Sequence, residues 1–288
     1  MSATQSHALP YRLVTPERLT SCVLFASPHS GRDYPSELLM HSVLEARRLR
    51  SSEDAFVDDL LEAVPREGAM LLAARLPRAW VDLNRGEDEL DPALIEGLRR
   101  SVGGPRVAAG LGVIPRVVSG GRAIYSGKIS VGEAETRLAR VWRPYHARLE
   151  ELMGDLRTRF GRAILLDMHS MPAEALETLG PNRPDVVLGD RYGTAARPAT
   201  VAAIERVFTG LGLKVGRNTP FAGAYVAQRY GRPREGWEVV QIEIVRSLYM
   251  NEAEVCPSHD FPAFAAKMAQ AVAGLAAIGR DAGRMAAE

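Results

Sequence analysis

Cysteine is scarce in this 288-residue sequence, which contains only Cys22 and Cys256 and no CxxC pair. Two cysteines cannot supply the disulfide framework of a small secreted scaffold, and they do not form a cysteine-rich zinc module. This scarcity indicates a reducing compartment, and we expect the protein to be cytoplasmic.

Long apolar runs and an excess of one charge are also lacking. The N-terminus, MSATQSHALPYRL, has no basic segment followed by an apolar one, so it is unlike a signal peptide. We find no stretch that approaches the roughly 20 apolar residues that span a bilayer. The formal net charge of +1 provides no overall field that favours nucleic acid or a membrane surface. We therefore expect neither as a partner, whereas the oligomeric state stays open.

The composition is that of a globular protein. Apolar residues make up 46% of the chain and charged residues 25%, which is enough to build a sizeable core. The length suits one large α/β unit. We predict a single domain over residues 1–288, of which residues 1–15 form a loose N-terminal arm.

Short apolar runs alternate with helical patterns along the chain. The runs predict strands at residues 22–26, 69–74, 79–83, 163–167, 186–188, 214–215 and 239–244. Helical spacing predicts helices over residues 53–64, 132–160, 200–211 and 261–278, with a kink or junction at Pro144. Between residues 86 and 128, many Gly and Pro residues predict a long surface excursion with a small hairpin near Gly120 and Gly121. This alternation indicates an α/β sheet with helices on both faces.

Polar side chains follow three of the predicted strands. His29 follows the first strand, Asn84 and Arg85 follow the third, and His169 follows the fourth. In α/β sheets, functional groups gather where strands end at their carboxyl edge. We therefore expect these side chains to converge.

A metal site is the first function that these residues suggest. Imidazole is the commonest zinc ligand, although each of His29 and His169 could instead be a strand-end residue bonded to backbone. A catalytic zinc takes three protein ligands, and we prefer Asp54 as the third, with Glu53 second. Both acids would also be favourable at a helix N-terminus. Asp167, two residues before His169, would orient that imidazole or cap a loop.

Glu243 is the candidate general base. It lies in the alternating run Gln241-Ile242-Glu243-Ile244, which places Gln and Glu on one face of a strand. A carboxylate on a core strand is costly unless it is paired or used, whereas on a half-exposed face it needs no function. A carboxylate near a metal can accept the proton of an activated water.

Arginines are the candidate substrate-binding residues. Arg85 offers a planar fork that matches a carboxylate. Arg78, Arg229 and Arg246 are further options, although arginine is abundant here and most of these side chains are expected to be solvated.

Seven stretches resemble, in order, the N-formylglutamate amidohydrolase family: SPHSGRDYP, SSEDAFVDDL, RAWVDLNR, WRPYHARL, LLDMHSMP, NTPFAGAYVAQRYGRP and VVQIEIVRSLYMNE. Their number and order make the resemblance specific, and it covers nearly the whole chain. The family is similar to the zinc carboxypeptidases and to aspartoacylase-like deacylases, which also carry a DLNR element. The resemblance implies a zinc-exopeptidase-like fold, a three-layer α/β/α sandwich around a mixed sheet.

The resemblance also implies a ligand set for one zinc ion per chain. His29 and His169 match the zinc-binding histidines, and Asp54 matches an acidic position after the first motif. The carboxypeptidase pattern has a glutamate three residues after the first histidine, where this chain has Arg32, so a more distant acid must serve. His146, in the PYH element, is a reserve ligand or lies behind the ligands.

The implied reaction is hydrolysis of N-formyl-L-glutamate to formate and L-glutamate by a metal-activated water, a step of histidine degradation. Glu243 matches the catalytic carboxylate. By similarity to the deacylases, Arg85 and Asn84 hold the substrate carboxylate and Arg78 faces the scissile carbonyl. The segment between residues 88 and 128 matches less well, which leaves the acyl group and the preferred side chain open.

Other functions stay open on sequence alone. The same site could serve another N-acyl amino acid or a carboxypeptidase-like peptidase, or the chain could be a non-catalytic domain that binds a small acid. A serine or cysteine nucleophile is disfavoured because no GxSxG element occurs. Two histidines and one carboxylate also bind iron, cobalt or manganese, so the metal itself is not fixed.

Overall fold

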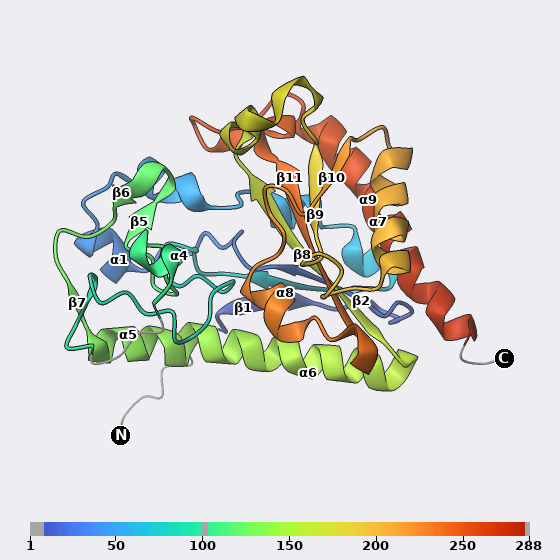
Figure 1. The fold of residues 1–288 in the computed structure, drawn as a ribbon, viewed down its shortest axis with the longest axis horizontal. Helices are drawn as coiled ribbons and strands as arrows, with labels where there is room; N and C mark the ends of the chain where they lie inside the picture. The colour runs from blue at the N-terminus through green and yellow to red at the C-terminus, as the bar shows by residue number, and fades with distance from the viewer. Residues whose placement is uncertain (1–8, 99–102, 286–288) are drawn as a thin grey trace.

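A seven-stranded mixed sheet forms the centre of the computed structural model, which describes residues 9–98 and 103–285 (Figure 1). The strand order is β1-β3-β2-β8-β11-β9-β10. The strands are β1 (Tyr11–Val14), β2 (Val23–Ser27), β3 (Met70–Ala74), β8 (Ala163–Met171), β9 (Val186–Gly189), β10 (Val215–Arg217) and β11 (Trp237–Val245). Two neighbouring pairs, β1 with β3 and β9 with β11, are antiparallel and the other pairs are parallel.

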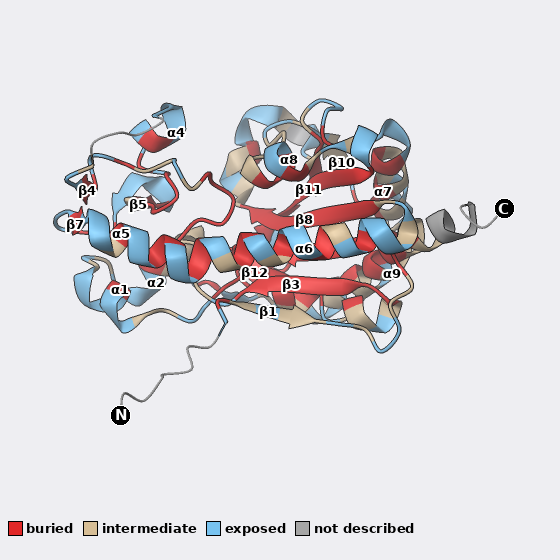
Figure 2. Cartoon of the chain, turned by 90° about the horizontal axis from the view of Figure 1, so that it is seen from below, coloured by how far each residue is buried: buried red, intermediate tan, exposed pale blue. Residues whose placement is uncertain are grey.

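Helices cover both faces of this sheet. The described α-helices are α1 (Ser36–His41), α2 (Ala46–Leu49), α3 (Val57–Leu60), α4 (Pro105–Ala108), α5 (Val131–Arg137), α6 (Arg143–Phe160), α7 (Pro198–Gly210), α8 (Tyr225–Tyr230) and α9 (Phe261–Met285). On one face, Leu149 of α6 shares a buried cluster with Leu165 and Val239 of the sheet. On the other, Met268 of α9 shares a cluster with Leu166. The predicted three-layer α/β/α sandwich is therefore confirmed, and β3, β8 and β11 are buried along their length (Figure 2).

The last helix, α9, corrects one expectation from the sequence. Its segment Phe261–Arg280 is long and apolar enough to cross a bilayer by length and composition. However, Met268, Val272 and Leu275 on this helix are fully buried against the sheet layer. A core helix of an α/β layer passes the same test, so this helix is only weak evidence for a membrane span.

The excursion predicted between residues 86 and 128 is confirmed. It contains α4 and the short strands β4 (Ile95–Glu96), β5 (Val117–Val118) and β6 (Arg122–Ala123), and β7 (Ile129–Ser130) follows it directly. Strands β5 and β6 pair antiparallel around the exposed tip 119–121, which is the predicted hairpin. Figure 1 shows these elements with α1 at one end of the molecule, away from α7 and α9. A further hairpin, β12 (Met250–Asn251) with β13 (Cys256–Pro257), follows β11.

The helical span predicted over residues 132–160 is divided into three parts. Helix α5 continues into a π-helical turn, Leu138–Trp142, and then into α6, in which Pro144 is the second residue. Proline is tolerated in the first turn of a helix, and π turns are often associated with functional sites. In this turn the indole of Trp142 donates a 2.9 Å hydrogen bond to the carbonyl of Arg85. The junction predicted at Pro144 is therefore confirmed.

Three local predictions are wrong in part. The arm predicted over residues 1–15 contains strand β1, because Leu13 pairs in register with Leu72 of β3; residues 1–8 lie outside the described part. Residues 79–83 do not form a strand, because β1 and β2 already occupy both edges of β3. The helix predicted over residues 53–64 shrinks to α3, because Phe56 has a left-handed φ of 65°. Residues 53 and 54 therefore precede the helix.

Candidate active site

The carboxyl ends of β2, β8 and β11 lie at one edge of the sheet, since these strands are mutually parallel. Asp167 and His169 are two residues apart on β8 and share a face of the sheet. On β11, Gln241 pairs in register with Asp167, and Glu243 pairs with His169. His29 lies two residues beyond the end of β2. The convergence predicted for the two histidines is therefore confirmed.

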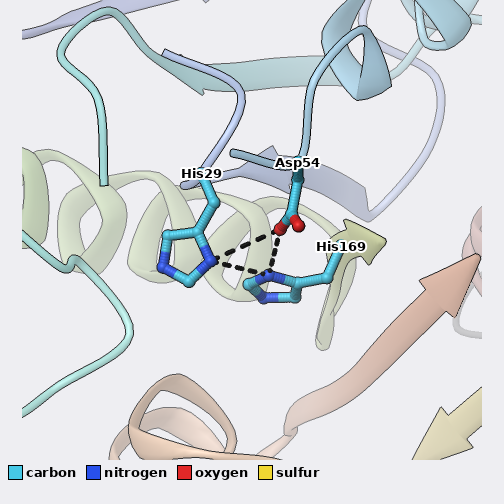
Figure 3. Close-up of side chains that lie close together, drawn as sticks. All are labelled: His29, Asp54 and His169. Atoms are coloured by element: carbon cyan, nitrogen blue, oxygen red, sulfur yellow. Dashed lines mark hydrogen bonds and ion pairs between the residues drawn. The ribbon is translucent and has the colours of Figure 1, made fainter. Parts of the chain in front are cut away.

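His29, Asp54 and His169 present three ligand atoms to one point (Figure 3). The Nδ1 atoms of the two histidines lie 3.1 Å apart. Oδ2 of Asp54 lies 3.4 Å from Nδ1 of His29 and 3.0 Å from Nδ1 of His169. All three side chains are buried. We call these three atoms the ligand triangle.

Each imidazole of the triangle is oriented by a buried carboxylate behind it. Nε2 of His29 lies 2.8 Å from Oδ1 of Asp82, and Nε2 of His169 lies 2.9 Å from Oδ2 of Asp167. An ionised carboxylate can only accept a hydrogen bond, so the imidazole must donate and its proton lies on Nε2. The lone pair of each Nδ1 then faces the triangle, as in the carboxylate–histidine arrangement of metal sites.

Asp54 is held in place from two sides. Its backbone N–H donates a 3.0 Å hydrogen bond to the carbonyl of His29, which ties its loop to the loop after β2. Its second oxygen, Oδ1, accepts hydrogen bonds from the Ser170 hydroxyl at 3.0 Å and from Arg246 at 3.1 Å. Only Oδ2 faces the histidines, so Asp54 offers one ligand atom.

The triangle fits a zinc-type ion. Around a tetrahedral zinc with ligand distances of about 2.0–2.1 Å, neighbouring ligand atoms are separated by about 3.3 Å. The three distances of the triangle, 3.0, 3.1 and 3.4 Å, match this separation. Two histidines and one carboxylate are also a known catalytic zinc ligand set. These residues can therefore hold a metal ion.

Charge within the triangle supports the same conclusion. Burial would raise the pKa of Asp54, but its contacts with His169 and His29 hold that pKa well below its usual value. Burial opposes a charge on His169, but Asp167 and Asp54 outweigh it and raise the pKa of this histidine well above its ordinary value. The site therefore attracts positive charge, which a proton supplies to the metal-free protein.

A cavity of about 270 Å³ lies against the ligand triangle. Its described lining residues are His29, Asp54, Arg78, Asn84, Arg85, Arg106, Leu111, His169, Ser170, Met171, Pro172, Phe221, Ala224, Gln241, Glu243 and Arg246. Four of these are arginines and two are carboxylates, one of which is in the triangle. We call this space the inner cavity. Its excess of guanidinium groups suits an anionic ligand.

The arginines of the inner cavity differ in how they are engaged. Arg78 donates from Nε to Oδ2 of Asp82 at 2.9 Å. Arg85 donates from Nε to the Leu111 carbonyl at 3.0 Å and from Nη1 to the Asn84 carbonyl at 2.8 Å. Burial, together with the charges of neighbouring arginines, lowers the pKa of Arg85. An arginine crowded by like charges is stabilised when an anion binds beside it.

Arg246 is placed differently from the prediction. All three of its nitrogens are engaged: Nε with the Ser170 hydroxyl, Nη1 with the Ser51 carbonyl and Nη2 with Asp54. It lines the inner cavity, but its guanidinium holds the carboxylate of Asp54 in place. The geometry therefore favours a positioning role for Arg246.

Glu243 lies beside the ligand triangle and lines the inner cavity. The amide of Gln241 donates a 2.7 Å hydrogen bond to its Oε1. Burial raises the pKa of Glu243, and the charge of Asp54 adds to this effect while His169 opposes it. A carboxylate with a raised pKa is a better proton acceptor than a solvated one, which suits a general base.

The side-chain amide of Asn84 is hydrogen-bonded to other residues of the protein. Its Nδ2 donates to Oδ2 of Asp167 at 3.2 Å and to Oε1 of Gln241 at 3.3 Å. Its side-chain oxygen, Oδ1, accepts a hydrogen bond from the backbone N–H of Val226. Since these contacts occupy the carboxamide, Asn84 is placed to support the ligands and Gln241 as well as to line the cavity.

Three other predicted residues lie apart from the triangle. Arg229 is 42% exposed, pairs with Glu150 and does not line the inner cavity, so the expectation that it binds substrate is not supported. His146 donates from Nε2 to the Leu83 carbonyl and contacts the Tyr230 hydroxyl through Nδ1, so neither nitrogen is available as a ligand.

Glu53, the other residue predicted as a reserve ligand, is also engaged elsewhere. Its carboxylate pairs with Arg50 and accepts a hydrogen bond from Tyr34.

Sequence reasoning assigned no role to Asp82, Gln241 and Arg106. Asp82 belongs to the same RAWVDLNR element as Arg85, and Gln241 shares a strand face with Glu243, so both carried a signal in the sequence. Arg106 lies on α4 in the weakly matching excursion, where nothing in the sequence sets it apart from other arginines.

Three buried residues that can hold a metal ion, a buried carboxylate and clustered arginines at one sheet edge suit a hydrolase that acts on an anionic substrate. The model of one family, N-formylglutamate amidohydrolase, matches residues 21–250. The chain belongs to this family. The resemblance seen in the sequence motifs is thereby confirmed, as is the expectation that the protein is an amide-hydrolysing enzyme.

Individual relatives agree with the family model. The chain is 31% identical to an N-formylglutamate deformylase of Pseudomonas aeruginosa over 233 residues, which cover 80% of this chain and 82% of that protein. It is similar to a crystal structure of N-formylglutamate amidohydrolase from Ralstonia eutropha JMP134, with 38% identity and a TM-score of 0.89 over 95% of this chain and 99% of that one. A gene product of Agrobacterium tumefaciens, 17% identical with a TM-score of 0.63 over 94% of this chain and 96% of that one, shares the fold.

Proposed function

We propose that this protein hydrolyses N-formyl-L-glutamate to formate and L-glutamate. The observation that carries the proposal is the ligand triangle beside Glu243 in a cavity rich in arginine. The names of the relatives from Pseudomonas aeruginosa and Ralstonia eutropha support the same substrate.

We further propose that His29, Asp54 and His169 hold one zinc ion per chain. Zinc bound by these residues supplies a Lewis acid that lowers the pKa of water and polarises a carbonyl oxygen. Asp82 and Asp167 keep both Nδ1 atoms directed at the triangle, and Arg246 keeps Asp54 in register. Iron, cobalt or manganese could occupy the same ligand set, and metal analysis distinguishes them.

Glu243 carries the proton in this proposal. Its carboxylate accepts a proton from the attacking water, whose oxygen adds to the formyl carbon. Glu243 then delivers the proton to the amide nitrogen as the C–N bond breaks. The remaining acid proton passes from formic acid to the released amine, so one amide and one water give one formate and one ammonium group. The hydrogen bond from Gln241 fixes Oε1 of Glu243, which leaves Oε2 for the transfer.

In this proposal the arginines of the inner cavity bind the substrate and stabilise the developing negative charge. Arg78, which is anchored through Nε by Asp82, stabilises the negative charge that develops on the formyl oxygen. Arg85 and Arg106, on the inner cavity wall, bind the carboxylates of the glutamyl part. Fixing both ends of the substrate keeps the formyl carbon beside Glu243.

We assign the enzyme to the cytoplasm, with a small N-acyl amino acid as its partner and neither nucleic acid nor a membrane. Cys22 is buried and Cys256 is exposed, and neither forms a disulfide, which supports a reducing compartment. Histidine degradation is the process in which formylglutamate hydrolysis would serve.

The direct test is formate release from N-formyl-L-glutamate by the purified protein, with N-formyl-L-aspartate and a carboxylate-ended dipeptide in parallel. We expect formate from formylglutamate, loss of activity with a chelator and recovery with zinc. Faster release from the dipeptide would favour the peptidase alternative. Binding of glutamate without any turnover, in protein shown to contain zinc, would favour the non-catalytic alternative.

A further inference from the structure

A second cavity, of about 420 Å³, adjoins the inner cavity. Its described lining residues are Ser51, Ser52, Arg78, Asp82, Ala109, Leu111, Pro115, Val117, Val118, Ser119, Gly120, Gly121, Pro172 and Arg246. Four of them, Arg78, Leu111, Pro172 and Arg246, also line the inner cavity, so the two spaces adjoin at these side chains. We call the second space the outer cavity.

The positions of the charged groups assign the two cavities to opposite ends of the substrate. Arg85 and Arg106 line only the inner cavity, which places the carboxylates of the amino acid there. Arg78 lines both cavities and faces the scissile carbonyl in the proposed function. With the carbonyl oxygen at Arg78 and the carboxylates at Arg85 and Arg106, we place the substituent on the acyl carbon toward the outer cavity. A formyl group carries only a hydrogen at this position, so it leaves the outer cavity without a substrate group.

The polarity and charge of the outer cavity lining indicate which kind of acyl substituent fits there. Apolar side chains and glycines from the β5–β6 hairpin and from Ala109, Leu111 and Pro172 dominate it. Asp82 is the one carboxylate among the described residues of this lining, and its oxygens already accept hydrogen bonds from His29, Asn84 and Arg78.

An ammonium group would thus find no free carboxylate in the described lining and would face the charges of Arg78 and Arg246. The lining therefore disfavours an aminoacyl group, as in a dipeptide, and favours an uncharged aliphatic chain.

We propose that the outer cavity is an acyl-binding subsite and that the enzyme also hydrolyses N-acyl-L-glutamates with short, unbranched aliphatic acyl groups. This inference rests on the proposed function and extends its substrate class. The reaction is the same: water adds to the acyl carbon, the C–N bond breaks, and a short-chain carboxylate and glutamate are released.

The test is kcat/KM for formyl-, acetyl-, propionyl- and butyryl-L-glutamate with the zinc-loaded enzyme. From acetyl to butyryl, each methylene enters apolar surface, and we expect kcat/KM to rise by up to about tenfold per methylene. Hydrolysis of the formyl compound with a steep fall along the other three would overturn the subsite and leave the proposed function intact. No hydrolysis of any of the four would overturn both.

A matched pair of substrates tests the chemistry of the lining. Glycyl-L-glutamate is nearly isosteric with propionyl-L-glutamate but carries an ammonium group in place of the terminal methyl. We expect the propionyl compound to be preferred by about 100-fold or more, because the ammonium group would meet serine hydroxyls but no free carboxylate and would face the charges of Arg78 and Arg246. Equal rates, or a preference for the glycyl compound, would contradict the proposal.

A variant that fills the outer cavity tests its location. Ala109 is exposed, lies at the end of α4 and lines only the outer cavity, so Ala109→Trp occupies that space. We expect kcat/KM for butyrylglutamate to fall about tenfold or more while that for formylglutamate changes less than about twofold. Ala108→Trp, on an exposed neighbour outside both linings, is the matched control and should change neither. An equal loss for both substrates in Ala109→Trp would place the acyl group elsewhere.

Discussion

Nε2 of His29 and Oδ1 of Asp82 lie 2.8 Å apart, and this contact turns Nδ1 of the histidine toward the ligand triangle. Asp82→Asn removes the charge and allows the amide to donate, which would favour the wrong imidazole tautomer. We expect metal affinity or kcat/KM to fall about 10- to 100-fold, as measured by competition with a chromophoric chelator and by formate release. Unchanged zinc affinity together with unchanged kcat/KM would contradict this role of Asp82.

Glu243→Gln tests the proton carrier without disturbing the triangle. The amide can still accept the hydrogen bond from Gln241. We expect zinc content to stay the same and kcat to fall about 10²- to 10⁴-fold, because the variant cannot accept a proton. If kcat stayed near the wild-type value in zinc-loaded protein, another group would have to act as the base.

We expect binding of the substrate carboxylates to depend on Arg85 and not on Arg229. Arg85→Gln keeps hydrogen-bonding capacity but removes the charge on the inner cavity wall. We expect KM for formylglutamate to rise about tenfold or more, since a charged hydrogen bond contributes roughly 1.5–3 kcal/mol. Arg229→Gln, on an exposed side chain outside the cavity, is the matched control and should leave KM unchanged. A larger effect at Arg229 would reverse this assignment.

Metal affinity should depend on pH through His169. Burial disfavours its charged form, but Asp167 and Asp54 raise its pKa well above the ordinary value in the metal-free protein. A proton must leave before this nitrogen can bind a metal, so protons compete with zinc and apparent affinity increases as pH rises. Zinc binding followed by calorimetry across pH 6–8 should show proton release, and affinity that increases as pH falls would contradict the account.

His146 should make the fold sensitive to acid. Burial lowers the pKa of His146 to about 3, so the imidazole stays neutral in the folded protein. In the unfolded chain it has its ordinary pKa of 6.5 and binds a proton below that pH. Its contribution to stability is complete above pH 6.5 and is lost as pH falls toward 3, at up to about 1.4 kcal/mol per pH unit. His146→Gln can keep both hydrogen bonds and removes this proton. Urea unfolding between pH 7 and 5 should therefore show a shallower loss in the variant than in the wild type.

The fold was largely predictable because its central strands are continuous apolar runs that end in polar residues. Residues 163–167 and 239–244 fall within β8 and β11, and both strands are buried along their length. The segment 79–83 looked equally strand-like, yet it has no place beside β3, whose two edges are already paired. Such competition for a sheet edge depends on the whole topology and is invisible in a local pattern.

The candidate site was predictable where residues follow strands and less so where loops bring them in. His29, His169 and Glu243 follow from strand ends and alternation. Asp54 is less evident, because its position depends on the left-handed Phe56 and on a backbone hydrogen bond to His29. Arg246 looked available for substrate, but burial beside Asp54 commits its nitrogens to the protein, and sequence alone does not show such commitments.

We propose that one metal ion in the ligand triangle makes this protein an N-formylglutamate hydrolase. The most direct measurement is formate release from metal-stripped protein titrated with zinc, for the wild type and for His169→Ala. We predict that activity rises linearly and stops at about one equivalent of zinc per chain in the wild type, and stays near zero in the variant. Full activity in the stripped wild-type protein, or equal activation of His169→Ala, would contradict the account.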